Sequence, residues 1–281
     1  MTSQDTDITK KTADLLELSN TELAERKDQI ITFIQDTVAN ANADGGVIGL
    51  SGGIDSTTTA FLAKEALGAE NVHGLIMPSD VNSDENMSDA ERVANMLNIA
   101  YDVIEINPIF DAFTTTYPEA KDDRVATGNV RVRIRGVLNY FVANHENRIV
   151  LGTGNRSEAL TGYFTKYGDQ AVDCNPIGNL YKYQVRQLAR NIGVPEEIVT
   201  KTPSAGMWAG QSDEEELGLS YDTLDGILAL HIDGPISASR TAAFLDIDID
   251  VIEHVEDLVI ESQHKRQMPP SPPRDEPVGF I

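Results

Sequence analysis

The strongest constraint on the fold of this chain is the regular alternation of short apolar runs with helical patterns. The apolar runs predict strands at residues 46–50, 72–77, 101–106 and 148–152. Helical patterns occupy the segments between them, at residues 57–67, 84–97 and 125–144. Strands joined by helices of this length form βαβ units, in which neighbouring strands run parallel. We therefore predict an α/β fold with a doubly wound parallel sheet flanked by helices on both faces.

The rest of the chain predicts further helices and an extended tail. Apolar residues three and four positions apart predict helices at residues 181–191, 221–230 and 249–263. An N-terminal helix is expected to begin after Ser19, because Glu22 stands at capping-box spacing from it. We expect a single domain over residues 1–281, with an N-terminal helical segment (1–44), a core (45–268) and an extended Pro-rich tail (269–281).

The charge balance limits the partners that the chain can bind. It has 45 Asp and Glu residues against 22 Lys and Arg residues, which gives a formal net charge of -23. Nucleic-acid binding draws on clustered Lys and Arg, so we expect no nucleic-acid partner. No apolar run approaches the roughly 18 residues that cross a bilayer, and the polar N-terminus lacks the apolar stretch of a secretory signal. We therefore expect no membrane partner and a cytoplasmic location.

Cys174 is the single cysteine of the chain. One cysteine cannot form an intramolecular disulfide, a CxxC zinc site or an iron–sulfur cluster. Because free cysteines are commonly buried and inert, we expect it to pack in the interior rather than act as a catalytic thiol.

The loop after the first predicted strand carries the strongest functional signal. Its sequence, SGGIDS from Ser51 to Ser56, is expected at the carboxyl edge of the sheet, where parallel sheets bind ligands. Consecutive glycines allow a ligand to approach the backbone, and N–H groups at a helix start bind phosphate oxygens. The loop is neither a Walker A motif, since no Lys follows the glycines, nor GxGxxG. Asp55 beside phosphates predicts a divalent cation between them, whereas an ordinary glycine turn capped by Asp or Ser is the alternative.

SGGIDS resembles the pyrophosphate-binding PP-loop of the ATP pyrophosphatase superfamily, whose members adenylylate a carboxylate or carbonyl oxygen with ATP and release pyrophosphate. Four further segments are similar to ammonia-dependent NAD synthetase, and with the loop they cover most of the chain. These segments are residues 128–135 (GNVRVRIR, with Val132 in place of the family's usual alanine), 152–177, 201–218 and 264–266. Five segments in the right order make an accidental resemblance very improbable.

The resemblance implies an adenine nucleotide alpha hydrolase-like, Rossmann-like fold and a set of site residues. ATP would be bound by Gly49, Leu50, Ser51, Gly52, Gly53, Ile54, Asp55, Ser56, Thr153, Lys182 and Ser204. Deamido-NAD would be bound by Arg133, Lys166, Asp173, His264 and Lys265. Asp55 and Glu158 would hold Mg²⁺. Asp55, Lys182 and Asp173 would act in catalysis, with Asp173 guiding or deprotonating ammonium.

Two of these residues can be judged apart from the resemblance. Glu158 follows the fourth predicted strand, so the sheet would bring it to the same edge as Asp55. Alone, Glu158 would equally suit the N-terminus of a helix, where acids are favourable. Lys182 begins a helix, where a cation is unfavourable unless a bound polyphosphate offsets the helix dipole. A solvated surface lysine is the alternative.

The resemblance implies ATP-dependent amidation of deamido-NAD with ammonia, giving NAD, AMP and pyrophosphate through an acyl adenylate. The glycine-rich segment 201–218 would form a lid that keeps water from the adenylate. Ammonia is the expected nitrogen donor, because only a short helical segment precedes the first strand, whereas glutamine-dependent relatives carry an added amidase domain. The family also implies a homodimer, and the apolar faces of the N-terminal helix and of helix 125–144 would suit that role.

Three other functions stay open at this point. A GMP synthetase-like PP-loop amidoligase would share SGGIDS but lack the segments 128–135 and 162–173. A tRNA-modifying PP-loop enzyme is disfavoured by the acidity of the chain and by its missing cysteines. A non-catalytic adenine-nucleotide-binding protein would need neither the second carboxylate nor a dinucleotide pocket.

The negative charge is unfavourable for a chain that binds two polyanions. The resemblance resolves this conflict, because it places the few cations at the site: Arg131, Arg133, Arg135, Lys166, Lys182, Lys201, His264, Lys265 and Arg266. The three arginines stand two residues apart on one helix, so they cannot all share a face, and ion pairs with surface carboxylates are their alternative role. The acid excess then belongs to the remaining surface and predicts stability and activity that rise toward molar salt.

Overall fold

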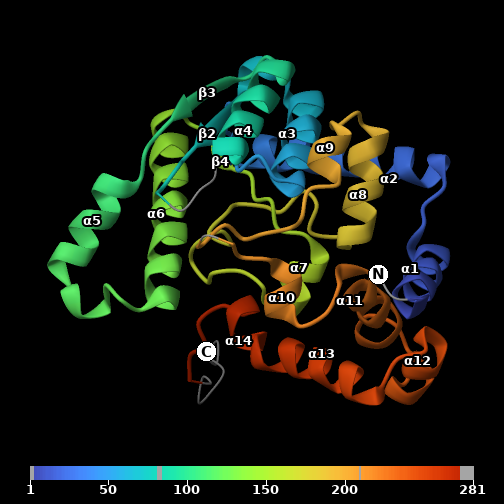
Figure 1. Cartoon of the computed structure of the whole chain (residues 1–281). Helices are drawn as coiled ribbons and strands as arrows, with labels where there is room; N and C mark the ends of the chain where they lie inside the picture. Colours follow the sequence, from blue (N-terminus) through green and yellow to red (C-terminus); the bar gives the residue numbers. More distant parts are fainter. Residues whose placement is uncertain (1–2, 81–83, 209, 273–281) are drawn as a thin grey trace, which may run out of the picture.

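The computed structural model describes residues 3–80, 84–208 and 210–272. Its strands are β1 (Gly46–Gly49), β2 (Val72–Ile76), β3 (Ala100–Val103) and β4 (Ile149–Val150). They form one parallel sheet in the order β3-β2-β1-β4 (Figure 1). The chain runs outward from β1 to β3 and then returns to place β4 on the other side of β1. The predicted doubly wound sheet is therefore confirmed, with its topological switch point between β1 and β4.

Helices from the first half of the chain cover both faces of this sheet. They are α2 (Asn20–Asn40), α3 (Ile54–Leu67), α4 (Asp84–Leu97), α5 (Asn107–Thr116) and α6 (Arg124–His145), with short 3₁₀ turns η1 (Ala69–Asn71) and η2 (Pro118–Ala120). Helix α1 (Ser3–Leu16) lies away from the sheet and packs on helices of the second half of the chain. Alternate residues of a strand face opposite sides. Ile48 and Ile76 pack into the cluster formed with α2, α3 and α4, whereas Val47 and Leu75 pack against α6. The predicted capping box of Ser19 and Glu22 is present at the start of α2.

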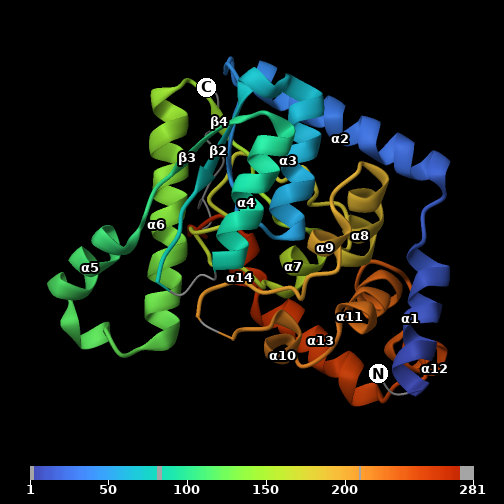
Figure 2. The ribbon, with the colours of Figure 1, turned by 45° about the horizontal axis from the view of Figure 1, so that its top comes forward.

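The second half of the chain is mostly helical, as predicted. Its elements are α7 (Arg156–Thr161), α8 (Lys182–Asn191), α9 (Glu196–Val199), α10 (Asp213–Leu217), α11 (Tyr221–Ile227), the π-helical turn η3 (Leu228–Ile232), α12 (Ala238–Leu245), α13 (Ile249–Glu261) and α14 (Gln263–Arg266). Helices α10 to α13 share a hydrophobic cluster with Leu16 of α1, so the N-terminal helix lies beside the C-terminal ones (Figure 1). Figure 2 shows α2 lying along α3 and α8, which extends the first cluster. The division into one domain with three segments stays a prediction.

Several predicted boundaries differ from the structure. The helix expected from residue 57 begins at Ile54, because Gly53 adopts the extended conformation of an N-cap residue, and this places Asp55 in the first helical turn. The strand expected at 101–106 ends at Val103, and β4 is only two residues long. The helix expected at 221–230 changes at Leu228 into η3. Residues 269–272 of the predicted tail have no regular structure, and 273–281 lie outside the described residues.

No described helix combines the length and the apolar character that crossing a bilayer requires. Cys174 is buried, and its backbone pairs with Leu151 in a bridge that prolongs the line of β4. Burial raises the pKa of its thiol to about 11, so the side chain stays protonated near neutral pH. This environment suits a packing residue.

Candidate active site

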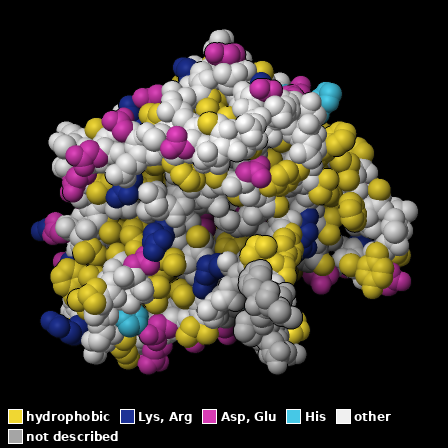
Figure 3. Space-filling model, turned by 180° about the vertical axis from the view of Figure 1, so that it is seen from behind, with side chains coloured by type: hydrophobic (Ala, Val, Ile, Leu, Met, Phe, Trp, Pro, Cys, Tyr) yellow, Lys and Arg dark blue, Asp and Glu magenta, His cyan; other side chains and the backbone are white. Residues whose placement is uncertain are grey.

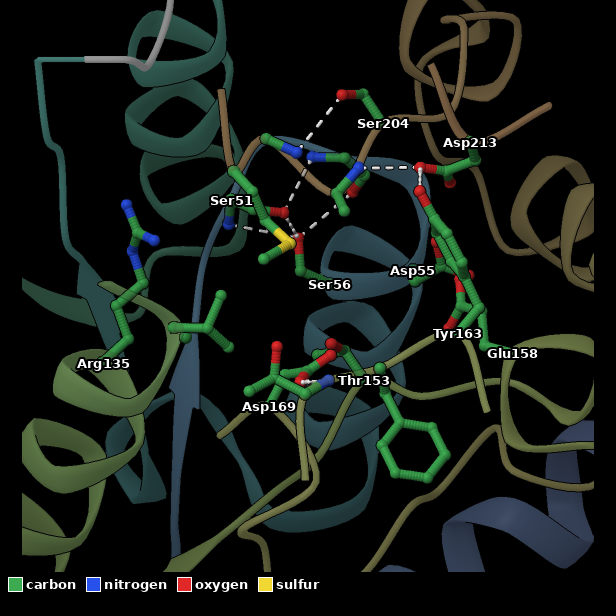
Figure 4. Close-up of a pocket in the computed structure, with 18 of the residues that line it drawn as sticks. Ser51, Asp55, Ser56, Arg135, Thr153, Glu158, Tyr163, Asp169, Ser204 and Asp213 are labelled. Carbon is green, nitrogen blue, oxygen red and sulfur yellow. Dashed lines mark hydrogen bonds between the residues drawn. The ribbon is translucent and has the colours of Figure 1, made fainter. Parts of the chain in front are cut away.

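A cavity of about 740 Å³ opens at the carboxyl ends of β1 and β4. This is the switch point of the sheet, where doubly wound folds bind ligands. The cavity is lined by the loop after β1, the segment after β4, one side of α6 and the segment 201–208. Figure 4 shows Arg135 on one side of it, with Glu158 and Tyr163 on the other. The sheet therefore brings together segments far apart in the sequence.

The loop Ser51–Ser56 is held open by its own hydroxyl groups. Ser51 Oγ and Ser56 Oγ lie 3.0 Å apart, and Ser51 Oγ also accepts the N–H of Gly53 at 3.3 Å. Gly52 forms the bend with a φ of +75°, a conformation in which a side chain would be strained. Helix α3 begins directly afterwards, so its first N–H groups lie beside the cavity, where they could bind an anion.

A lysine and two carboxylates converge next to this loop. Lys182 Nζ lies 2.5 Å from Asp55 Oδ2 and 3.3 Å from Glu158 Oε1. These residues begin three different helices, α8, α3 and α7, which meet at the switch point. Lys182 is only 1% exposed, so the alternative of a solvated surface lysine is wrong. The carboxylates compensate a cation that the dipole of α8 disfavours.

Burial sets the charges of this cluster. Burial alone would lower the pKa of Lys182, but the carboxylates of Asp55 and Glu158 outweigh it and raise that pKa above its ordinary value. Burial and the nearby Asp55 raise the pKa of Glu158, although Lys182 opposes this. Lys182 is therefore a fixed ammonium, and Glu158 is a carboxyl group whose charge depends on its partners.

Asn155 links the two sides of the cluster. Its Nδ2 donates to Asp55 Oδ1 at 3.0 Å, while its Oδ1 accepts the N–H of Glu158 at 3.0 Å as the N-cap of α7. Glu158 in turn accepts the N–H of Asn155 at 3.2 Å, which completes a capping box. Glu158 thus has the helix-capping role considered for it and also lines the cavity, whereas its role in binding Mg²⁺ stays a prediction. Thr153 lines the cavity just before this cap.

The acidic pair fits a magnesium ion that is shared with phosphates. Asp55 and Glu158 share one lysine nitrogen, so their carboxylates approach a common point. Mg²⁺ usually takes one or two protein carboxylates and completes its shell with phosphate oxygens and water. Within the described parts of the chain, no group of three or more His, Cys, Asp or Glu side chains could hold a metal ion alone. These residues therefore suit a cation that is bound together with a polyphosphate.

The predicted lid segment crosses the cavity and is tied down by Asp213. Its carboxylate accepts the N–H of Ala205 at 2.8 Å and the hydroxyls of Tyr163 at 3.0 Å and Tyr221 at 3.2 Å. Tyr163 also donates to Glu216 at 2.8 Å. Ser204, one of the residues expected to bind ATP, lines the cavity from this segment. The segment thus has fixed anchors at α10.

Met207 and Trp208, in the middle of the predicted lid segment, pack on α6. Arg124 stacks on the ring of Trp208 at 4.4 Å, and Met207 packs against Gly128. A Cβ at position 128 would stand 2.8 Å from the Met207 Cε and 3.3 Å from the Met207 Cβ, so a side chain there would require Met207 to shift. This contact gives a physical reason for the glycine of the 128–135 segment.

The three arginines of α6 point to different partners, as their spacing predicted. Arg131 is buried, pairs with Asp80 at 3.3 Å and stacks on Phe110 at 3.8 Å. Arg135 lines the cavity and donates to the carbonyl of Met77 at 3.0 Å. Burial, together with the charge of Arg131, lowers the pKa of Arg135 to about 10. Arg135 is therefore the member of the three that faces the ligand space.

The residues expected to bind deamido-NAD are less well gathered. Of these residues, only Lys265 is among the described residues that line the cavity. Its Nζ donates to the carbonyl of Gly162 at 2.7 Å. Arg133 donates to the carbonyl of Lys166 at 3.3 Å, and Lys166 donates to that of His264 at 2.6 Å. These three form a chain at the outer surface beside the cavity.

Asp173 belongs neither to the residues that line the cavity nor to the chain of Arg133, Lys166 and His264. Its carboxylate accepts the N–H of Val150 at 2.7 Å and the hydroxyl of Tyr140 at 3.1 Å. Its neighbour Val172 lines the cavity, whereas the Asp173 side chain is exposed beyond it. Asp173 therefore lies next to the site without facing the space that this single chain encloses.

Of the residues expected to bind ATP, Gly52 bends the loop and the others line the cavity: Gly49, Leu50, Ser51, Gly53, Ile54, Asp55, Ser56, Thr153, Lys182 and Ser204. Their roles stay predictions. The sequence did not single out Asn155, Tyr163, Asp169 or Asp213 as site residues. The spacing of Asn155 and Glu158 is a capping-box signal that could have revealed the first. The other three depend on tertiary contacts.

Comparisons with known proteins show the family of the chain. A family model described as NAD synthase matches residues 27–269. The NH(3)-dependent NAD(+) synthetase of Halobacterium salinarum is 62% identical over 257 residues, 92% of this chain and 96% of the relative. That of Pyrococcus horikoshii is 50% identical over 245 residues, 87% of this chain and 94% of the relative.

Two solved structures have a similar fold and sequence. The NMN synthetase from Francisella tularensis has a TM-score of 0.79 and 37% identity, covering 91% of this chain and 99% of that one. The NH3-dependent NAD synthetase from Campylobacter jejuni, in complex with the nitrate ion, has a TM-score of 0.74 and 34% identity, covering 89% of this chain and 99% of that one. On the family match and these identities, the chain belongs to the NAD synthase family.

Proposed function

We propose that the chain amidates deamido-NAD with ammonia at the expense of ATP, giving NAD, AMP and pyrophosphate. The observation that carries this proposal is the meeting of Asp55, Glu158 and Lys182 beside the glycine loop at the switch point. It supplies a cation and an acidic pair where a PP-loop would place the phosphates. The family match supports an NAD-forming ligase rather than a GMP synthetase, a tRNA-modifying enzyme or a non-catalytic nucleotide sensor.

The first step would activate the nicotinate carboxylate. A carboxylate oxygen attacks the α-phosphorus of ATP, the bond to the β-phosphate oxygen breaks, and pyrophosphate leaves with the electron pair. Lys182 and the N–H groups at the start of α3 would stabilise the charge that moves onto pyrophosphate. Mg²⁺ held by Asp55 and Glu158 would add positive charge at the phosphates. The protein mainly positions and neutralises the reacting groups.

The second step would transfer the acyl group to ammonia. The nitrogen attacks the acyl carbon, the bond to the AMP oxygen breaks, and the nitrogen releases protons to form the amide. We propose Asp173 as the residue that guides ammonium or accepts a proton. Both of its oxygens already accept one hydrogen bond, so they are oriented and retain lone pairs. The lid anchored by Asp213 would keep water from the adenylate.

We propose that two chains complete the dinucleotide site. Arg133, Lys166, His264 and Asp173 lie outside the space that one chain encloses. Hydrophobic side chains gather over α5 and α6, on the right of Figure 3. Val137 and Phe141 are exposed on α6, and the exposed Tyr167 lines a shallow hollow with them. Val137 is 68% exposed and Phe141 is 72% exposed, and apolar surface of this kind marks an interaction site. Sedimentation at several protein concentrations would detect the expected homodimer, and a monomer throughout would contradict it.

The reaction assay uses purified protein with ATP, Mg²⁺, ammonium and deamido-NAD, in low and in molar salt. We expect AMP, pyrophosphate and NAD in equal amounts, with higher activity in molar salt. Absence of NAD in both conditions would refute the proposal. Glutamine in place of ammonium tests the nitrogen donor, because equal activity with glutamine alone would contradict free ammonia. Cytoplasmic location stays a prediction from the sequence.

One structural neighbour is named NMN synthetase, so the main alternative substrate to deamido-NAD is a mononucleotide. The same assay with nicotinate mononucleotide decides between them. We expect the ratio kcat/KM to favour deamido-NAD, because the chain of Arg133, Lys166 and His264 extends the binding surface beyond the cavity. A preference for the mononucleotide would reassign the substrate while leaving the ATP chemistry in place.

A further inference from the structure

Two helices deliver the site residues, and their first turns are joined by a carboxylate outside the cavity. Glu158 is the third residue of α7, and Lys182 is the first residue of α8. Ser157 Oγ accepts the N–H of Lys182 at 3.0 Å and donates its own proton to Asp225 Oδ1. The other oxygen of Asp225 accepts the N–H of Tyr183 at 2.8 Å. One carboxylate thus holds the residue before Glu158 and the residue after Lys182.

Asp225 lies behind the site and is fully enclosed by protein. Asp225 and Ser157 are both 0% exposed, and Asp225 reaches the two helices from α11. Burial raises the pKa of Asp225 to about 7, with Arg186 lowering it and Asp222 raising it. An enclosed carboxylate is unfavourable unless its hydrogen bonds are satisfied. Capping α8 alone would not require such a group, because helix N-termini are commonly capped by exposed side chains.

A second aspartate repeats the link on the outer side. Asp233 follows η3 and binds Arg156, the first residue of α7, with Arg156 Nε 2.6 Å from Asp233 Oδ2. Asp233 also accepts the hydroxyl of Tyr181, the N-cap of α8. Asp225 and Asp233 therefore each contact the starts of both helices. The cartoon in Figure 1 labels α7, α8 and α11.

We propose that Asp225 is a positioning residue for the adenylylation step, holding the first turns of α7 and α8 so that Glu158 and Lys182 meet Asp55. The proposal rests on the proposed function for the identity of the step. It assigns a role in ATP binding to Asp225 of α11, a residue that does not line the cavity. Ser157 relays the position of Asp225 to Lys182 through two hydrogen bonds.

The test compares Asp225→Asn and Ser157→Ala with the wild-type protein. Asparagine keeps the size of the side chain and an acceptor for the Tyr183 N–H, but it presents a donor to Ser157. Groups that orient metal ligands typically change affinity or activity by about 10–100-fold when removed. We expect each variant to lower kcat by roughly that factor and to weaken Mg²⁺–ATP binding about tenfold, with KM for deamido-NAD changed less than about threefold. The fold decrease in kcat of the double variant should be no more than about twice that of the more impaired single variant. Both changes break the same set of hydrogen bonds, so their effects should not multiply.

The matched control is Thr12→Val. Thr12 is equally buried and contacts α11 from α1, donating to the carbonyl of Asp222 at 2.9 Å. We expect this variant to lower the melting temperature without changing Mg²⁺–ATP binding. The proposal would be overturned if Thr12→Val lowered kcat and Mg²⁺–ATP affinity as much as the test variants do. It would also be overturned if both test variants kept the kcat and the Mg²⁺–ATP affinity of the wild-type protein. Mg²⁺–ATP binding by calorimetry needs no acceptor substrate, so it tests Asp225 even if deamido-NAD proved to be the wrong substrate.

Discussion

The two halves of the site are built differently. On the ATP side, three helix starts converge, and each charged group has partners from the same chain, as in the contacts of Lys182 with Asp55 and Glu158. On the dinucleotide side, Arg133, Lys166 and His264 lie at the surface and bind mainly backbone carbonyls. An exposed apolar face lies on α6 beside them. The difference indicates that one chain can preorganise the groups of the ATP side, and it is the reason why we propose that the acceptor is recognised with the help of a second copy.

The largest effect is expected from Lys182→Ala. The change would remove the cation that we propose to act at the phosphates, and it would leave the partly buried carboxylates of Asp55 and Glu158 without their shared lysine. Loss of one preorganised charge-stabilising group lowers kcat by about 10²–10³-fold, and breaking a buried ion pair destabilises a protein by roughly 3–5 kcal/mol. Steady-state kinetics and urea unfolding measure the two effects. The control Lys27→Ala on α2 removes an exposed pair with Glu65 of α3 and should change neither measurably.

Asp225 gives the ATP side a distinctive pH dependence of stability. Its pKa is raised by burial to about 7 in the folded protein, above the ordinary value of 3.8. The stability that this protonated carboxyl contributes is complete below pH 3.8 and is lost as the pH rises through 7. Relative to Asp225→Asn, the wild-type protein should therefore lose roughly 3 kcal/mol of unfolding free energy between about pH 5 and pH 8. Urea unfolding at both pH values measures this, and a constant difference would contradict it.

The dinucleotide side should respond to changes of the exposed face. Phe141→Asp places a charge on the α6 surface, where Phe141 is 72% exposed. We expect the dimer to dissociate at micromolar concentration and kcat/KM for deamido-NAD to fall about tenfold or more, since a buried unpaired charge is unfavourable in an interface. Sedimentation and kinetics measure the two effects. The control Phe244→Asp changes a phenylalanine of α12 that is 48% exposed and should leave both unchanged.

The lid connects the two sides, and a smaller effect is expected there. Tyr163→Phe removes the hydroxyl that ties Asp213 to Glu216. Loss of hydrogen bonds to charged groups weakens closure by about 1.5–3 kcal/mol, so part of the adenylate should be hydrolysed before ammonia reacts. The ratio of AMP to NAD should rise well above the value of one expected for the wild-type protein. A ratio that stays at one would show that Tyr163 does not hold the lid.

The sequence predicted the ATP side better than the dinucleotide side, and the reason is local. SGGIDS and Glu158 follow strands, and parallel topology alone brings strand ends to one edge. Lys182 lies farther along the chain, and it is buried against Tyr221 of α11. The spacing of residues in the sequence did not predict this contact. The tether of Asp213 and the separation of Asp173 from the cavity follow from loop paths that periodicity does not encode. The strand predicted at residues 148–152 is present as β4, but it is only two residues long, because pairing with neighbours sets the length of a strand.

The most direct test of the contrast is to measure both ligands on the monomeric Phe141→Asp variant by calorimetry. We predict that Mg²⁺–ATP binds within about threefold of the wild-type affinity, because its site is complete in one chain. Deamido-NAD should bind at least about tenfold more weakly, because its site would lack the second copy. A monomer that binds deamido-NAD as tightly as the wild-type protein, or that loses ATP as well, would contradict the account.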